Sequence, residues 1–203
     1  MTFYVPQPGN LIPTRGNRLT RGIGRSILRV TGWKLAGEIP NVRKAVFIGA
    51  PHTSNWDFPL AITILFAIGI RLSWMGKHTF VDGPLKPLWH YMDGIPIDRR
   101  AAHGVVGEMV RQFQNRSDLI LGIAPEGTRS KANRWKMGFY YIAREAGVPI
   151  IPVLFDYGRK LITIGPPVAA VTNVHVVKAQ LSAFYQGATG RHPENYTPIL
   201  PND

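Results

Sequence analysis

His52 and Asp57 are the two residues whose types and spacing could perform acid–base chemistry. An imidazole has an ordinary pKa near 6.5, so a neutral histidine can accept a proton from a substrate at physiological pH. A carboxylate that accepts the other ring N–H fixes the tautomer and stabilises the imidazolium that forms. Along one continuous helix this spacing turns the chain by about 140°, which puts the two side chains on different faces. We therefore expect His52 in a loop and Asp57 in the first turn of the helix that follows.

A second polar segment, Glu126 to Arg129, follows an apolar stretch later in the chain. Gly127 permits a tight turn and lets the backbone approach a ligand closely. The backbone N–H groups near Gly127 and Thr128 are candidates for stabilising an oxyanion. The Arg129 guanidinium can hold a phosphate or a carboxylate through two parallel N–H bonds. Glu126 is expected to orient this loop or Arg129 rather than to perform chemistry.

Short apolar stretches alternate with helical patterns along the chain, which is typical of an α/β fold. Strands are predicted at residues 44–50, 71–76, 95–98, 118–124, 148–155 and 161–165. Helices are predicted at residues 58–68, 83–91, 101–115, 136–146 and 175–186. Ser54 or Asn55 is the expected N-cap of the first of these helices, and Gly147 the C-cap of the fourth. Because Pro149 and Pro152 cannot donate to a sheet ladder, the strand that contains them is expected to be bent or at an edge.

Four segments, taken in order, resemble the four sequence blocks of the glycerolipid acyltransferase family, which includes the 1-acyl-sn-glycerol-3-phosphate acyltransferases. They are residues 52–57 (HTSNWD), 94–99 (GIPIDR), 126–130 (EGTRS) and 148–153 (VPIIPV). A lone His-x4-Asp is common by chance, but its combination with a later Glu-Gly-Thr-Arg, each after an apolar strand, is specific. The resemblance implies a single α/β domain with a mixed sheet flanked by helices.

The resemblance also implies that the protein moves a fatty acyl group from acyl-CoA or acyl carrier protein to the hydroxyl of a lysophospholipid, above all lysophosphatidic acid. His52 is then the general base and Asp57 its partner. The sequence contains no Gly-x-Ser-x-Gly elbow and no cysteine. We therefore expect the acceptor hydroxyl to attack the thioester directly, without an acyl-enzyme intermediate. No cofactor is expected, and the other histidines show no spacing that would hold a metal.

Two arginines and a lysine match positions that the family links to the phosphate of the acceptor. Arg99 and Arg129 are these arginines, with Gly127 and Thr128 shaping the site. Lys77 resembles a lysine that the family places before the second block. The fourth block is expected to be structural, lining the core or part of an acyl-chain pocket.

The acceptor remains open on sequence grounds. Pro51 precedes the histidine, where many family members have asparagine. Arginine binds carboxylates as well as phosphates, so a lyso-amino-lipid or a glycolipid is an alternative acceptor. A basic module that binds nucleic acid or a membrane without catalysis is a second alternative; a nucleic-acid role would depend on charge alone, because no recognition motif accompanies it.

The formal net charge of +12 favours polyanionic partners such as an anionic membrane surface or phosphorylated substrates. Between residues 15 and 34 the basic residues are interspersed with apolar ones at mostly helical spacing: Leu19, Ile23, Ile27, Val30 and Trp33. This pattern predicts a basic amphipathic helix that lies in a membrane interface; the alternative is an ordinary surface helix that packs on the domain and has a solvated basic face. We expect residues 1–40 to form this N-terminal segment and residues 41–203 to form the acyltransferase domain.

No stretch of the sequence is long and apolar enough to predict a membrane-spanning helix. Residues 1–20 lack the apolar centre of a signal peptide. The expected location is therefore cytoplasmic, peripheral on the inner face of the cell membrane. The 45% of hydrophobic residues is typical of a globular chain rather than a disordered one.

Overall fold

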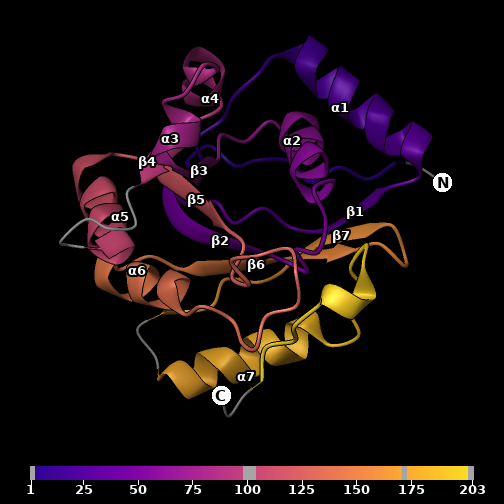
Figure 1. The fold of residues 1–203 in the computed structure, drawn as a ribbon. Helices are drawn as coiled ribbons and strands as arrows, with labels where there is room; N and C mark the ends of the chain where they lie inside the picture. Colours follow the sequence, from indigo (N-terminus) through magenta and orange to yellow (C-terminus); the bar gives the residue numbers. More distant parts are fainter. Residues whose placement is uncertain (1–2, 98–103, 171–172, 201–203) are drawn as a thin grey trace.

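A seven-stranded β-sheet forms the centre of the computed structural model, which describes residues 3–97, 104–170 and 173–200 (Figure 1). The strands are β1 (Lys34–Gly37), β2 (Lys44–Ala50), β3 (Ser73–Lys77), β4 (Gly94–Ile97), β5 (Leu119–Ile123), β6 (Ile150–Asp156) and β7 (Leu161–Ile164). Their order across the sheet is β1-β7-β6-β2-β5-β3-β4. Neighbouring strands run parallel, except for β6 and β7, which pair antiparallel. The predicted mixed sheet is therefore confirmed.

Helices cover both faces of this sheet, with α1 and α2 on one face and α6 and α7 on the other (Figure 1). The helices are α1 (Arg18–Thr31), α2 (Asp57–Ile68), α3 (His78–Val81), α4 (Lys86–Tyr91), α5 (Gly104–Asn115), α6 (Gly138–Ala146), α7 (Val174–Tyr185) and the short 3₁₀ turn η1 (Pro193–Asn195). One apolar core contains Leu28 of α1, Ile64 of α2 and Phe47 of β2. The other contains Phe113 of α5 and Phe139 of α6.

The predicted elements are present in the described residues, with ends that shift by a few residues; residue 98 of one predicted strand and residues 101–103 of one predicted helix lie outside that part of the chain, and the short helix α3 was not predicted. The strand expected at residues 44–50 coincides with β2, and Gly147 ends α6 in the left-handed conformation. The edge strand β1 was not predicted. Only Leu35 of its residues is buried, so β1 has none of the apolar run by which a strand is recognised.

The start of α2 differs from the prediction. Its N-cap is Trp56, rather than Ser54 or Asn55, and the Trp56 side chain makes no capping bond. Ser54 instead forms a turn ahead of the helix, in which its hydroxyl accepts the N–H of Trp56 at 3.2 Å. Asp57 accepts the Ser54 N–H at 2.9 Å, so this carboxylate orders the turn that leads into its own helix.

Of the two alternatives predicted for the proline-containing strand, a bend or an edge position, the edge position is wrong. β6 lies inside the sheet, between β7 and β2. The Pro152 carbonyl accepts the N–H of Gly165 at 2.8 Å, and in a strand the N–H and C=O of one residue point to the same side. An N–H at position 152 would therefore point toward β7, near the end of that strand at Ile164. Because this side of Pro152 faces away from β2, the proline removes no hydrogen bond between β6 and β2.

The predicted basic amphipathic helix is present as α1, and it packs on α2 through Gly24 and Leu28. Gly24 allows this close approach, since an added Cβ would lie 2.5 Å from the backbone nitrogen of Ala67 in α2. Trp33 lies beyond the helix and is buried. The remaining predicted apolar residues of the stripe face away from the protein, with exposed fractions of 70% for Leu19, 47% for Ile23, 44% for Ile27 and 86% for Val30.

The carboxyl ends of β2, β5 and β3 meet at one edge of the sheet, because these neighbours are parallel. The two predicted polar segments directly follow β2 and β5, so the topology brings them together. β1 belongs to the predicted N-terminal segment, residues 1–40, but it pairs within the same sheet as the strands of residues 41–203. The division of the chain into these two parts at residue 40 stays a prediction. Within the described residues, no helix has both the length and the apolar character needed to cross a bilayer.

Candidate active site

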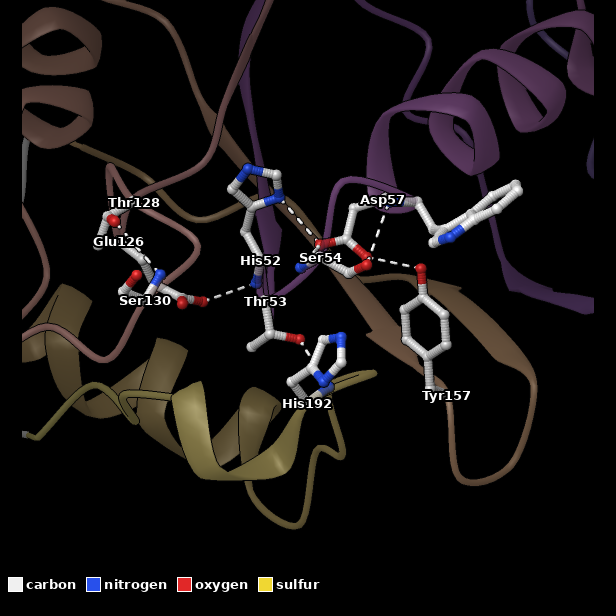
Figure 2. A network of polar contacts seen from close by, with 10 residues as sticks. His52, Thr53, Ser54, Asp57, Glu126, Thr128, Ser130, Tyr157 and His192 are labelled. Carbon is white, nitrogen blue, oxygen red and sulfur yellow. Dashed lines mark hydrogen bonds and ion pairs between the residues drawn. The ribbon is translucent and has the colours of Figure 1, made fainter.

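His52 and Asp57 form the expected pair (Figure 2). His52 Nδ1 lies 3.0 Å from Asp57 Oδ2. His52 lies in the loop after β2, and Asp57 is the first residue of α2, as the spacing required. Because Nδ1 donates its hydrogen to Asp57, Nε2 keeps its lone pair and can accept a proton. The His52 side chain is 26% exposed and that of Asp57 only 5%, so a substrate can reach the base while the carboxylate is enclosed.

Asp57 is a buried carboxylate that hydrogen bonds keep ionised. Besides His52, it accepts the backbone N–H of Ser54 and the hydroxyl of Tyr157, the latter at 2.6 Å. Burial by itself raises the pKa of Asp57, but the hydrogen bonds from His52, Tyr157 and Ser54 outweigh this effect and lower the pKa below its ordinary value. Asp57 therefore stays charged at neutral pH and can stabilise a protonated His52.

Tyr157 is a site residue that the sequence does not reveal. It lies in the turn between β6 and β7, where its backbone N–H donates to the Thr189 carbonyl at 2.8 Å. Its ring packs edge-on against Trp33 with 5.0 Å between the centroids. Burial and the hydrogen bond to Asp57 raise the pKa of Tyr157, so its hydroxyl remains a donor throughout the physiological range. A single tyrosine 100 residues from its partner carries no local signal.

The Glu126 carboxylate joins the two polar segments. Its Oε1 accepts the backbone N–H of His52 at 2.8 Å, so Glu126 orients the loop of the histidine (Figure 2). The side chain is 1% exposed, and Oε2 has no hydrogen-bond partner among the described residues. Burial raises the pKa of Glu126 to about 7, although the bond from the His52 N–H acts in the opposite direction. The ionised form of this buried carboxyl is therefore disfavoured relative to water.

The loop after β5 turns tightly at Gly127, which has a φ of 67°. The Gly127 N–H donates to the Ala124 carbonyl at 3.1 Å, so it is not free to bind an oxyanion, and the N–H of Thr128 is the candidate that remains. The Thr128 hydroxyl accepts the N–H of Ser130 at 3.2 Å. Arg129 is exposed, and no acidic side chain in the described part of the chain forms an ion pair with it.

A pocket of about 930 Å³ includes both polar loops and a large apolar wall. Its polar end consists of His52, Asp57, Thr128, Arg129, Ser130 and Lys136. Its apolar part includes Phe47, Ala61, Ile64, Leu65, Val153 and Ile162 on the side of α2, together with Val105 of α5 and Phe139 and Ile142 of α6. Such an apolar lining beside a few polar groups is typical of a small-molecule binding site.

Two further phosphate ligands, Lys77 and Arg99, were predicted from the sequence. Lys77 ends β3 at the same edge of the sheet and is exposed, but it does not line the pocket. Arg99 lies outside the described residues. Of the fourth segment, Val153 lines the pocket, whereas Ile150 and Ile151 are buried in the two cores. No cluster of three or more possible metal ligands occurs in residues 3–97, 104–170 and 173–200.

The segment after α7 fastens both polar loops. The His192 N–H donates to the hydroxyl of the buried Thr53 at 3.1 Å (Figure 2). The Thr197 hydroxyl accepts the N–H of Ala132 at 2.9 Å and donates to its carbonyl at 2.8 Å. The Trp135 ring N–H donates to the Thr197 carbonyl at 2.7 Å. One stretch of chain thus contacts the loop after β2 and the loop after β5.

Curated relatives and solved structures resemble this chain. The 1-acyl-sn-glycerol-3-phosphate acyltransferase of Haemophilus influenzae is 29% identical over 153 residues, which are 70% of this chain and 61% of that protein. The protein of the same name from Escherichia coli is 34% identical over 116 residues, 54% of this chain and 45% of its own length. This chain therefore spans between about half and three-fifths of these relatives.

The crystal structure of the 1-acyl-sn-glycerophosphate (LPA) acyltransferase PlsC from Thermotoga maritima matches with a TM-score of 0.56. The match covers 85% of this chain and 81% of that one at 19% sequence identity, so it concerns the fold alone. The family model described as Acyltransferase matches residues 34–156, which include His52, Asp57 and the Glu126 loop. Because that match covers more than half of the chain, the protein belongs to the Acyltransferase family.

Proposed function

We propose that the protein transfers a fatty acyl group from acyl-CoA or acyl carrier protein to the free hydroxyl of lysophosphatidic acid, which yields phosphatidic acid. The observation that carries this proposal is the His52–Asp57 pair at the polar end of a largely apolar pocket, beside an exposed arginine without an acidic partner in the described part of the chain. The names of the curated relatives support the choice of acceptor.

The reaction follows from the orientation of the imidazole. The acceptor hydroxyl gives its proton to His52 Nε2 while its oxygen attacks the thioester carbonyl. The new C–O bond forms, the C–S bond breaks, and the leaving thiolate takes the proton back from the imidazolium. Asp57 stabilises the imidazolium in between, because it stays ionised and accepts the Nδ1 hydrogen.

The acyl chain and the phosphate occupy different parts of the pocket in this proposal. The apolar wall between α2 and the sheet holds the hydrocarbon chain. Arg129 binds the phosphate of the acceptor, and the family resemblance adds Lys77 and Arg99 to this role. Arginine also binds carboxylates, so the product formed from a mixed lipid extract and labelled acyl-CoA, identified by mass spectrometry, distinguishes lysophosphatidic acid from other acceptors.

We further propose that α1 attaches the protein to the inner face of the cell membrane from the cytoplasmic side. The apolar side chains of α1 are exposed, and Arg18 and Arg29 on the same helix are exposed as well. An apolar stripe beside arginines fits the interface of an anionic bilayer, where the acceptor itself resides.

Replacing His52 by Ala is expected to lower kcat with acyl-CoA and lysophosphatidic acid by about 10²- to 10⁴-fold, the range that a general base contributes. Asp57→Asn is expected to lower kcat as well, because the asparagine cannot stabilise an imidazolium. Steady-state assays measure both, with circular dichroism to check that the fold is retained. Turnover of His52→Ala at the wild-type rate would contradict the mechanism.

Tyr157→Phe is expected to lower kcat by roughly tenfold, the equivalent of one hydrogen bond to a charged group, and to leave the KM of both substrates unchanged. The reason is that Tyr157 touches Asp57 rather than a substrate. Tyr141→Phe is the matched control, since Tyr141 is exposed on α6. A KM effect without a kcat effect, or equal kinetics for both variants, would refute this positioning role.

Glu126→Gln is expected to change how stability depends on pH. A folded-state pKa of about 7, raised from 4.5, favours the protonated acid in the folded protein, so its contribution to stability is present below pH 4.5 and is lost as the pH rises through 7. A shift of this size corresponds to about 3 kcal/mol. Urea unfolding between pH 5 and pH 8 should show a fall in the wild type that Glu126→Gln lacks and that the exposed Glu145→Gln control retains. Identical slopes in all three proteins would rule out this effect.

Serine at Leu19, Ile23 and Ile27 together is expected to weaken binding to vesicles that contain phosphatidylglycerol by at least about tenfold, because apolar area is lost from the bilayer contact. The melting temperature should hardly change, since these side chains are exposed. Vesicle sedimentation measures the binding, with Val176→Ser on α7 as the exposed control. Equal sedimentation of the triple variant and the wild type would exclude α1 as the membrane contact.

A further inference from the structure

Lys136 is a cation at the polar end of the pocket to which neither the sequence motifs nor the family blocks assign a role. Four basic residues lie close together after the Glu126 turn, and no acidic residue occurs between Glu126 and Glu145. The four are Arg129, Lys131, Arg134 and Lys136. Only Arg129 and Lys136 of these line the pocket that contains His52, which separates them from ordinary surface charges.

The backbone of Lys136 is fixed on both sides. Its N–H donates to the Pro125 carbonyl at 2.8 Å. This bond places Lys136 beside the start of the Glu126 turn. The preceding Trp135 is buried and donates its ring N–H to the Thr197 carbonyl. The position of Lys136 is thus determined by the fold, whereas its side chain is exposed.

The Lys136 side chain lies across Gly127. A Cβ on Gly127 would be 2.9 Å from both Cδ and Nζ of Lys136, so any larger residue would displace the lysine. Besides permitting the positive φ, the missing side chain of Gly127 leaves room for the lysine in this position. The ammonium group lies next to the residue that follows Glu126, whose carboxylate holds the His52 loop.

The charge of this pair is uncompensated within the described part of the chain, where no acidic side chain forms an ion pair with Arg129 or Lys136. A guanidinium offers two parallel donors to one edge of a phosphate, and an ammonium adds a compact point charge. A phosphate monoester carries between one and two negative charges at neutral pH, so it matches two cations better than one.

We propose that Lys136 binds the phosphate of the lysophospholipid acceptor together with Arg129, and that Gly127 is a glycine in part because the lysine passes over it. This inference depends on the proposed acyl transfer to a phosphate-bearing acceptor and names a further residue of that site. A thioester donor such as acyl-CoA also carries phosphates, so the test must separate the two sources.

The test compares Lys136→Met with Lys131→Met, an exposed lysine of the same loop that does not line the pocket. Lys136→Met is expected to raise the KM for lysophosphatidic acid by about tenfold or more, the loss of one charge-assisted bond. The KM for acyl-CoA and kcat should stay within about twofold of the wild type. Lys131→Met should resemble the wild type in all three parameters, and melting temperatures check that both variants fold.

An unchanged KM for lysophosphatidic acid in Lys136→Met would overturn the proposal. A rise in the KM for acyl-CoA alone would also overturn it, because the lysine would then serve the donor. Calorimetric binding of glycerol 3-phosphate provides a readout that needs no turnover. Binding by the wild type that Lys136→Met loses supports the lysine as a phosphate ligand even if no acyl transfer is found, in which case only the proposed function fails. Absence of binding by the wild type would refute the phosphate assignment.

Discussion

The hydrogen bond from the His52 backbone to Glu126 is the contact on which the site depends. It connects two loops that are 74 residues apart in the sequence, and it fixes the backbone from which the imidazole projects. The sheet makes the contact possible, because β2 and β5 are parallel neighbours whose carboxyl ends coincide. Glu126 is buried, and its second carboxylate oxygen has no partner among the residues that the structure describes, which destabilises the fold. The two apolar cores on either side of the sheet offset this cost.

Around that contact, the site contains an enclosed negative charge and an exposed group of positive charges. Asp57 is enclosed and receives three hydrogen bonds, which keeps its negative charge in place beside the imidazole. Arg129 and Lys136 on the other loop are exposed and line the same pocket as His52. The proposed chemistry needs both environments, since the base requires a fixed neighbour and the lipid headgroup requires an accessible one. The apolar wall between α2 and the sheet completes the site.

The sequence predicted the parts of this site that depend on local rules. The spacing of His52 and Asp57 required a loop and a first helical turn, and both are present. The alternation of apolar runs and helical patterns predicted the α/β fold, whereas β1 escaped notice because a four-residue edge strand buries little. Tyr157 could not be found, since its position beside Asp57 depends on the whole sheet. Pro152 led to the wrong prediction of an edge strand. The effect of its missing N–H depends on the order of the strands, which cannot be read from the local sequence.

The stretch that contains His192 and Thr197 has a consequence for how the protein is made. Its hydrogen bonds to Thr53 and Ala132 fasten the two loops after both have already been synthesised. All seven strands precede this stretch in the sequence, so a chain that has not yet been synthesised to Thr197 lacks these bonds. Until then, a nascent chain would expose an apolar groove without a fully ordered base beside it.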